Sequence, residues 1–417
     1  MTAEIGILNT QGIALAADSA VTIGSSKVFN SADKLFSLSK HHPIGIMIYG
    51  NAGFMGVPWE TVIKVFRKNL GDTTYDTLDE YISCFFEFLI RDTRFYNKDY
   101  EAEMLQRKFM KFLDELLENI NDQIPYIFNT GPDESDIQNI LFAEAFFYAD
   151  SYSRLETVNG FDDTYYKVFD SNFSVQIESV LKTRINVDID TETWERFLII
   201  GACLVMKDIY SDETGVVFAG FGDKEIFPTL KSYSLEGIFN GVLKYKGKHK
   251  VEIDVINSAT IVPFAQQEMV HSFLTGIDPE LKREIVNTIE KITKTYPKVV
   301  DEHIININDV QKNGMADFGK TVVDQFVKHI NDMIEEKFSA PVVNTVASLP
   351  KEELAAMAEA LINLTSIKRR MSSQTETVGG PIDVAVISKG DGFIWIKRKH
   401  YFSHELNHSY FTNYMER

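Results

Sequence analysis

A threonine directly follows the initiator methionine, so that removal of Met1 would make Thr2 the first residue of the chain. A small second residue favours this removal. A threonine hydroxyl is a weak nucleophile unless a base lies beside it. A free α-amine, with an ordinary pKa of about 7.7 to 8.0, can accept the hydroxyl proton directly or through a water. Thr2 is therefore a candidate nucleophile that carries its own base.

Such a nucleophile needs a cation that lowers the pKa of the amine, an anion that fixes the cation, and a backbone N–H for the oxyanion. The sequence offers Asp18 at the end of one predicted strand, Lys34 before another, and Gly50 at the end of the next. A glycine at that strand end permits a close approach of a substrate carbonyl. Each residue alone is typical of a turn or a solvated charge, so their order and spacing carry the prediction.

In this order and spacing the residues resemble the β-subunits of the proteasome and of the related bacterial ring peptidase. The match covers about the first 60 residues: Thr2, Gly6, Gly12, the stretch LAADS with Asp18 and Ser19, Lys34 in DKLFSL, and GNAG from Gly50 to Gly53. The resemblance implies a four-layer αββα fold of the N-terminal nucleophile (Ntn) hydrolases. It also implies that Thr2 is nucleophile and, through its amine, general base. Lys34 would then tune the amine, Asp18 would orient Lys34, and the Gly50 N–H would face the oxyanion.

The resemblance further implies a first specificity pocket. The residues at its positions are all small or apolar: Val21, Ala32, Ile48 and Ala52. We therefore expect a peptide or protein substrate with an uncharged, apolar side chain at the cleaved residue.

The second half of the chain departs from the family pattern. The family has D-x-x-S-G-G before its late strand, whereas this chain keeps Gly379 and Gly380 but has Thr375 and Val378 in place of the Asp and Ser. Glu376 is a candidate replacement for the missing Asp, with a solvated loop carboxylate as the alternative. A scaffold or binding protein without turnover is therefore a second hypothesis for the function.

A second motif lies near the C-terminus, where His404, Glu405 and His408 form H-E-x-x-H and His400 precedes them by one turn. On a helix the three imidazoles would share a face, and Glu405 could act as the base of a zinc hydrolase. The sequence after His408 is short for a further ligand, so a solvated C-terminal helix is the favoured interpretation. Threonine chemistry itself needs no metal or organic cofactor.

The elements that must position these residues follow from the hydrophobic pattern. Short apolar runs predict strands over residues 4–50, and a helical period extends from about 58 to 210. Strands return at 215–222, 251–262 and 381–402, with helices predicted at 279–296, 315–338 and 350–370. This order predicts an α+β layered core made of residues 1–57 and 216–417, with a helical insertion at 58–215.

Composition limits the partners. Lys and Arg number 42 against 60 Asp and Glu, and the net charge of -18 disfavours binding to nucleic acid or to anionic membranes. The longest apolar run, FLIIGACLVM, is shorter than the roughly 20 residues of a membrane span. The N-terminus lacks the basic segment of a signal peptide. We expect a soluble cytoplasmic protein, and homo-oligomer formation stays open.

Overall fold

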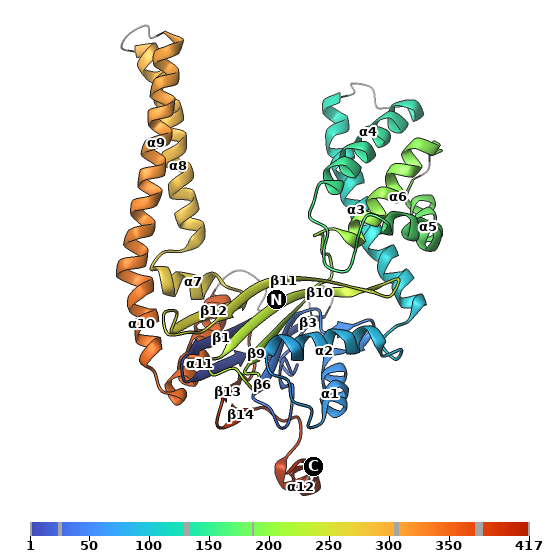
Figure 1. Ribbon diagram of the computed structural model, residues 1–417. Coiled ribbons are helices and arrows are strands. Elements are labelled where there is room, and N and C mark those ends of the chain that lie inside the picture. The colour runs from blue at the N-terminus through green and yellow to red at the C-terminus, as the bar shows by residue number, and fades with distance from the viewer. Residues whose placement is uncertain are drawn as a thin grey trace.

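The computed structural model describes residues 2–23, 27–127, 133–185, 187–303, 308–371 and 378–415. Two five-stranded antiparallel sheets form its centre (Figure 1). In spatial order the first sheet contains β12 (Ala259–Ala265), β1 (Ala3–Asn9), β2 (Gly12–Ala17), β13 (Asp383–Ser388) and β14 (Gly392–Lys397). The second contains β11 (Val242–Glu252), β10 (Thr229–Phe239), β9 (Thr214–Gly220), β6 (Ile44–Gly50) and β5 (Leu35–Ser37). Two small ribbons pair β3 (Val21–Ile23) with β4 (Lys27–Phe29) and β7 (Gly53–Phe54) with β8 (Val57–Pro58).

The helices fall into three groups along the chain. Between β8 and β9 lie α1 (Trp59–Leu70), α2 (Leu78–Arg91), α3 (Lys98–Ile127), α4 (Glu134–Ser153), α5 (Tyr165–Arg184) and α6 (Thr191–Met206). Between β12 and β13 lie α7 (Glu268–Thr275), α8 (Pro279–His303), α9 (Asp309–Ile334), α10 (Ala340–Ser348) and α11 (Lys351–Met371), with a π-helical turn at Glu335–Ser339. A 3₁₀ turn at His404–Leu406 and α12 (His408–Met415) follow the last strand. The prediction of a mixed helix and strand chain is confirmed, with antiparallel sheets.

The alternation of side chains along β1 shows how the sheets pack. Ile5 and Ile7 belong to a buried cluster with α7, α10 and α11, whereas Leu8 belongs to a cluster shared by the two sheets. A Cβ at Gly6 would lie 2.7 Å from Leu230 of the second sheet, so the even-numbered residues of β1 face between the sheets. The other face of the second sheet packs against α1 and α2.

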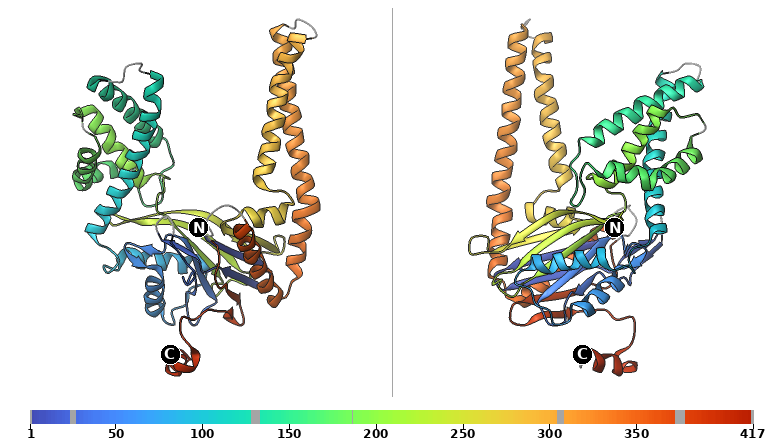
Figure 2. Two further views of the ribbon diagram at one scale, coloured as in Figure 1. Left: turned by 180° about the vertical axis from the view of Figure 1, so that it is seen from behind. Right: turned by 45° about the vertical axis from the view of Figure 1, so that its right-hand side comes forward.

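Two helical arms project from the same side of the sheets (Figures 1 and 2). One arm is the long hairpin of α8 and α9, and the other is built from α3 to α6, which share their own hydrophobic cluster. In all three views the N-terminus lies between the bases of the arms. The start of β1 therefore lies on the side of the sheets from which both arms project.

The structure corrects four details of the predicted elements. Residues 251–262 are not one strand, because β11 ends at Glu252 and β12 begins at Ala259. The long hairpin of β10 and β11 and the short helix α10 were not predicted, and α8 continues through Pro297 to His303. Among the helices that the structure describes, none combines the length and the apolar character of a membrane span.

A buried ionic cluster joins α3 to the hairpin of β10 and β11. Glu236 lies 2.6 Å from the Lys108 ammonium and 2.9 Å from that of Lys244, and all three side chains are nearly fully buried. Glu236 also accepts the backbone N–H of Ser211, in the loop that leads to β9. Burial alone would raise the pKa of Glu236, but the Lys244 and Lys108 ammonium groups lower it to about 2. The cluster therefore fixes one arm to the second sheet.

Replacing Glu236 by Gln is expected to lower the free energy of unfolding at pH 7 by about 3 kcal/mol, because the buried Lys108 ammonium and Lys244, whose pKa burial and Lys108 lower to about 7, lose their carboxylate. Since the folded-state pKa of Glu236 is below its ordinary value of 4.5, its contribution is complete above that value and is lost as the pH falls toward 2. Urea unfolding at pH 7 and pH 3 checks both statements. The control is Glu178→Gln, which removes an exposed pair with Lys182 and should change the stability by less than about 0.5 kcal/mol. A Glu236→Gln loss of equal size at both pH values would contradict the electrostatic cause.

Candidate functional site

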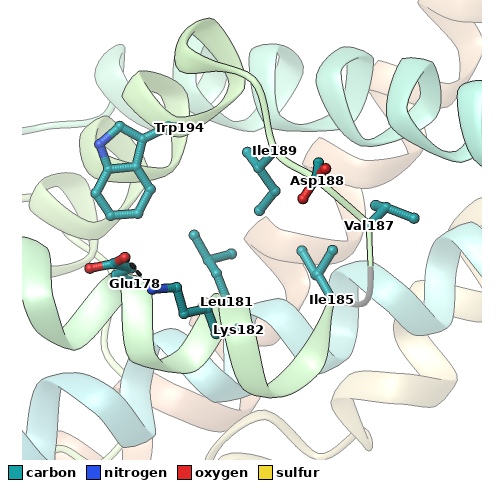
Figure 3. Close-up of a pocket in the computed structure, with 8 residues that line it drawn as sticks. All are labelled: Glu178, Leu181, Lys182, Ile185, Val187, Asp188, Ile189 and Trp194. Atoms are coloured by element: carbon teal, nitrogen blue, oxygen red, sulfur yellow. Dashed lines mark hydrogen bonds and ion pairs between the residues drawn. The ribbon is translucent and has the colours of Figure 1, made fainter.

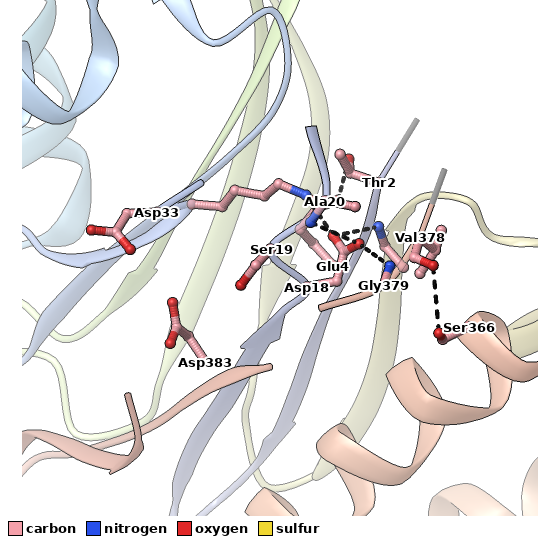
Figure 4. A network of polar contacts seen from close by, with 12 residues as sticks. Thr2, Glu4, Asp18, Ser19, Ala20, Asp33, Ser366, Val378, Gly379 and Asp383 are labelled. Atoms are coloured by element: carbon pink, nitrogen blue, oxygen red, sulfur yellow. Dashed lines mark hydrogen bonds and ion pairs between the residues drawn. The ribbon is translucent and has the colours of Figure 1, made fainter. Parts of the chain in front are cut away.

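Thr2 lies directly before β1, and its side chain is buried with 6% exposure. Its hydroxyl donates a hydrogen bond of 3.1 Å to Glu4 (Figure 4). Its carbonyl oxygen accepts the N–H of Gln266, just beyond β12, at 3.2 Å. Ala265 has a positive φ of 56°, which turns the backbone at this point. Both the backbone and the hydroxyl of Thr2 are therefore held in place.

The structure places Asp18 and Lys34 together close to Thr2. Lys34 donates to Oδ1 of Asp18 at 2.5 Å, and both side chains are buried. Asp18 also accepts three backbone N–H groups: Ala3 at 3.2 Å, Ala20 at 3.3 Å and Gly379 at 2.9 Å. Since a carboxylate held by several donors keeps a fixed position, Asp18 can orient the Lys34 ammonium.

Glu4 is the functional side chain that the sequence reasoning missed. Its carboxylate is 1% exposed, accepts the Thr2 hydroxyl, and lies 3.5 Å from the Lys34 ammonium. Burial raises the pKa of Glu4 to about 8, with Lys34 opposing the rise and Asp18 adding to it. One buried ammonium is thus shared by two buried carboxyl groups.

Gly50 ends β6 with a φ of 82°, a conformation that favours glycine. A Cβ there would lie 2.6 Å from the Glu213 carbonyl oxygen, so the position excludes any side chain. The next residue is held from both sides: Asn51 donates to the Glu213 carbonyl at 3.1 Å and accepts the Thr214 hydroxyl at 2.9 Å. This packing fixes the backbone that the sequence predicts to face an oxyanion.

A cavity of about 180 Å³ joins these residues. Thr2, Lys34 and Gly50 line it together with all four predicted pocket residues, Val21, Ala32, Ile48 and Ala52. Two carboxylates not predicted for this pocket also line it, and each has a cationic partner: Asp33 lies 3.1 Å from Lys399, and Glu60 pairs with Lys64. The lining thus combines the four small or apolar residues with Lys34 and two carboxylates, and Lys399 is shared between Asp33 and the buried Asp383.

The predicted supporting residues lie around Asp18. Ser19 is buried, donates its hydroxyl to the Pro381 carbonyl at 2.5 Å, and donates its N–H to the Gly379 carbonyl. Gly379 in turn donates to Asp18, which brings the late loop to the start of the chain. Glu376 lies outside the described residues, whereas Val378 is buried and accepts the Ser366 hydroxyl at 3.5 Å (Figure 4).

The C-terminal motif does not form the continuous helix that a zinc site of this kind requires. Glu405 belongs to a 3₁₀ turn that ends at Leu406, and α12 begins only at His408. His400 precedes the turn and packs its ring against Phe402. In the part of the chain that the structure describes, no group of three or more His, Cys, Asp or Glu residues is placed to hold a metal ion.

A larger cavity, of about 530 Å³, lies in the helical arm between α5 and α6 (Figure 3). Its described lining residues are Glu178, Leu181, Lys182, Ile185, Val187, Asp188, Ile189 and Trp194. They include no Ser, Thr, Cys or His, so these residues offer no nucleophile for hydrolysis. The smaller cavity at Thr2 is therefore the candidate active site.

No protein-family model and no curated protein matches the chain. Among solved structures, the chain is similar to the Anbu complex from Pseudomonas aeruginosa, described as a helical assembly, with 9% identity and a TM-score of 0.31 over 99% of this chain and 94% of that one. It is also similar to Anbu, described as an ancestral beta-subunit, from Yersinia bercovieri, with 8% identity and a TM-score of 0.28 over 99% and 94%. A Gly-1 mutant of Anbu from Hyphomicrobium sp. strain MC1 gives 9% identity and a TM-score of 0.30 over 100% and 96%.

These findings correct the predicted resemblance to proteasome β-subunits. The solved structures named above are Anbu proteins and not proteasome β-subunits, and no family model assigns the chain to that family. Identities below 10% with TM-scores near 0.3 establish neither a shared activity nor a shared assembly. Function has to be inferred from the site itself.

Proposed function

We propose that the chain is an N-terminal threonine hydrolase that cleaves peptide amide bonds through an acyl-enzyme on Thr2. One observation carries the proposal. A buried threonine hydroxyl, next in sequence to the removable Met1, opens on a cavity that Lys34 and the Gly50 backbone also line. The proposed nucleophile Thr2, the cation Lys34 and the proposed oxyanion donor Gly50 thus line the same cavity.

The proposed cycle begins when removal of Met1 frees the α-amine of Thr2. The hydroxyl oxygen attacks the substrate carbonyl, its proton passes to a neighbouring base, and the oxyanion forms opposite the Gly50 N–H. Protonation of the amide nitrogen expels the first product, and water then hydrolyses the ester on Thr2. The free α-amine of Thr2 is the candidate base next to the hydroxyl, with Lys34 tuning it and Asp18 orienting Lys34.

The fold that we propose for this chemistry is the four-layer αββα arrangement of Ntn hydrolases. The buried cluster between the two sheets and the helical clusters on their outer faces support it. Residues 1–57 and 216–417 would form the hydrolase unit, and residues 58–215 the insertion. Within the insertion, α1 and α2 pack on the second sheet, whereas α3 to α6 form their own cluster.

The proposed substrate carries an uncharged, apolar side chain at the cleaved residue. Val21, Ala32, Ile48 and Ala52 supply the small and apolar walls of the cavity. Asp33 and Glu60 each contact a lysine, but Asp33 shares Lys399 with Asp383, so the expected apolar preference rests on the four wall residues alone.

Covalent labelling tests the proposal. We expect a peptide vinyl sulfone with leucine at the reactive position to modify the protein once, and peptide mapping by mass spectrometry to place the adduct on the N-terminal peptide that begins at Thr2. Intact mass shows whether Met1 has been removed from the protein that reacts. An adduct confined to Cys84 or Cys203, or no adduct on protein that lacks Met1, would favour the scaffold without turnover.

A further inference from the structure

Glu4 occupies a position in β1 where a carboxylate is costly. The strand alternates, so Glu4 shares with Gly6 and Leu8 the face directed between the two sheets. Its side chain is 1% exposed, and an unpaired carboxylate at such a depth is strongly unfavourable. An apolar residue at this position would stabilise the packing between the sheets more than a carboxylate does. We therefore expect the Glu4 carboxylate to have a chemical role.

The contacts of Glu4 are with the reacting groups of the proposed site. Oε2 accepts the Thr2 hydroxyl at 3.1 Å, and Oε1 lies 3.5 Å from the Lys34 ammonium. The Asp18 carboxylate, by contrast, binds backbone N–H groups and Lys34, and no recorded contact joins it to the Thr2 hydroxyl. Of the two buried carboxylates, Glu4 is the one in contact with the nucleophile.

We propose that Glu4 is a catalytic residue of this site and accepts the proton of the Thr2 hydroxyl. The proposal rests on the proposed function, because it requires Thr2 to be the nucleophile. It changes the role of the α-amine: once Met1 is removed, the protonated amine supplies the second cation. Lys34 and this ammonium then balance the charges of Glu4 and Asp18.

The proton transfers balance over one cycle. In acylation the bond between the Thr2 oxygen and the substrate carbon forms, the hydroxyl proton moves to Glu4, and Glu4 returns it to the amide nitrogen as the carbon–nitrogen bond breaks. In deacylation a water attacks the ester carbon and gives one proton to Glu4. Glu4 then protonates the Thr2 oxygen as the ester bond breaks. Glu4 ends each half as a carboxylate, and no further reactant is needed.

The groups that face Glu4 decide when it is ionised. These groups are Thr2 just before β1, Asp18 at the end of β2, Lys34 before β5 and Tyr49 of β6. Burial, with the Glu213 and Glu4 charges, raises the pKa of Tyr49 to about 12, so Tyr49 is neutral near pH 7. Before removal of Met1, burial also holds the pKa of Glu4 at about 8, which leaves it mostly protonated at pH 7. The new ammonium favours the carboxylate, so trimming of Met1 prepares the base.

The test compares wild-type protein with Glu4→Gln, which keeps the shape and a hydrogen-bonding oxygen but cannot accept a proton. The readout is the second-order rate of labelling by the leucine vinyl sulfone between pH 5 and pH 9. We expect Glu4→Gln to lower the rate about 100-fold or more and to remove the rise with pH that the wild-type protein shows. Glu103→Gln, an exposed substitution on α3, is the matched control and should leave rate and pH profile unchanged.

A Glu4→Gln protein that labels at the wild-type rate with the wild-type pH profile would overturn the role of Glu4 while leaving Thr2 as nucleophile. Wild-type protein that lacks Met1 and fails to label at all would overturn the proposed function, and this inference with it. Circular dichroism and thermal unfolding establish that each variant is folded. If Glu4→Gln does not fold, Glu4→Asp is tested in its place. Its carboxylate lies one methylene further from the Thr2 hydroxyl, so the labelling rate should fall and the midpoint of its pH profile should move. An unchanged labelling rate and pH midpoint would overturn the proposal.

Discussion

Replacing Thr2 by Ala is expected to abolish labelling by the vinyl sulfone and any peptide hydrolysis, with a loss of at least about 10⁴-fold. The hydroxyl of Thr2 lines the cavity together with Lys34 and Gly50, and no other threonine or serine hydroxyl does so among its described lining residues. The fold should survive, because the variant removes one hydrogen bond, to Glu4, worth about 1 kcal/mol. Labelling rate and thermal unfolding, measured on the same preparation, separate the two effects.

The Thr2→Ala substitution should not change the removal of Met1. Alanine is as small as the residue-2 types that favour removal of Met1, so intact mass should show the same trimming in the variant. Thr2→Ser keeps a hydroxyl and should retain labelling within about tenfold of the wild-type rate. If Thr2→Ala still labels at the wild-type rate, the nucleophile is another residue and the assignment of Thr2 is wrong.

The geometry around Thr2 was accessible from the sequence because it depends on local elements close together in the chain. Asp18, Lys34 and Gly50 each lie at the edge of a short strand, and strands joined by tight turns leave little freedom in where their ends meet. The hairpin between β1 and β2 is one example: the Asn9 side chain accepts the Gln11 N–H at 2.9 Å, which closes the turn. The structure accordingly brings these three residues to one place.

Glu4 could not be recognised in the same way, for a physical reason. In a strand, a charged residue between apolar ones usually marks a solvent-exposed face, so the pattern gives no sign that Glu4 is buried. Its burial follows from the second sheet covering β1, which depends on strands more than 200 residues away, such as β10. A charge at an even position beside Gly6 was the available signal, since that glycine marks the face where the sheets approach each other.

The support of Asp18 depends equally on distant chain segments. Gly379 donates its N–H to Asp18 across 361 positions of sequence, and this contact exists only because β13 pairs with β2. The sequence indicated the two glycines and a strand, but not which carboxylate they would meet. In the described part of this loop, from Val378 onward, the backbone N–H of Gly379 contacts the site.

Replacing Lys34 by Met is expected to remove labelling activity by about 10²- to 10⁴-fold and to lower the free energy of unfolding by about 3–5 kcal/mol. Within the described residues, Lys34 is the only side-chain cation in ion-pair contact with Asp18 and Glu4. Methionine fills a similar volume, so the loss measures charge more than packing. The exposed pair of Glu60 and Lys64 provides the control, because Lys64→Met should cost less than about 1 kcal/mol.

The pH dependence of the Lys34→Met variant shows whether charge is the cause. Without the ammonium, the buried carboxylates have folded-state pKa values raised above their ordinary ones, so the folded state binds more protons than the unfolded state and stability falls as the pH rises. We therefore expect the destabilisation, measured by urea unfolding, to be larger at pH 8 than at pH 5. An equal loss at both pH values would mean that Lys34 contributes packing alone, and the ion cluster that the proposed catalysis requires would then lack its central charge.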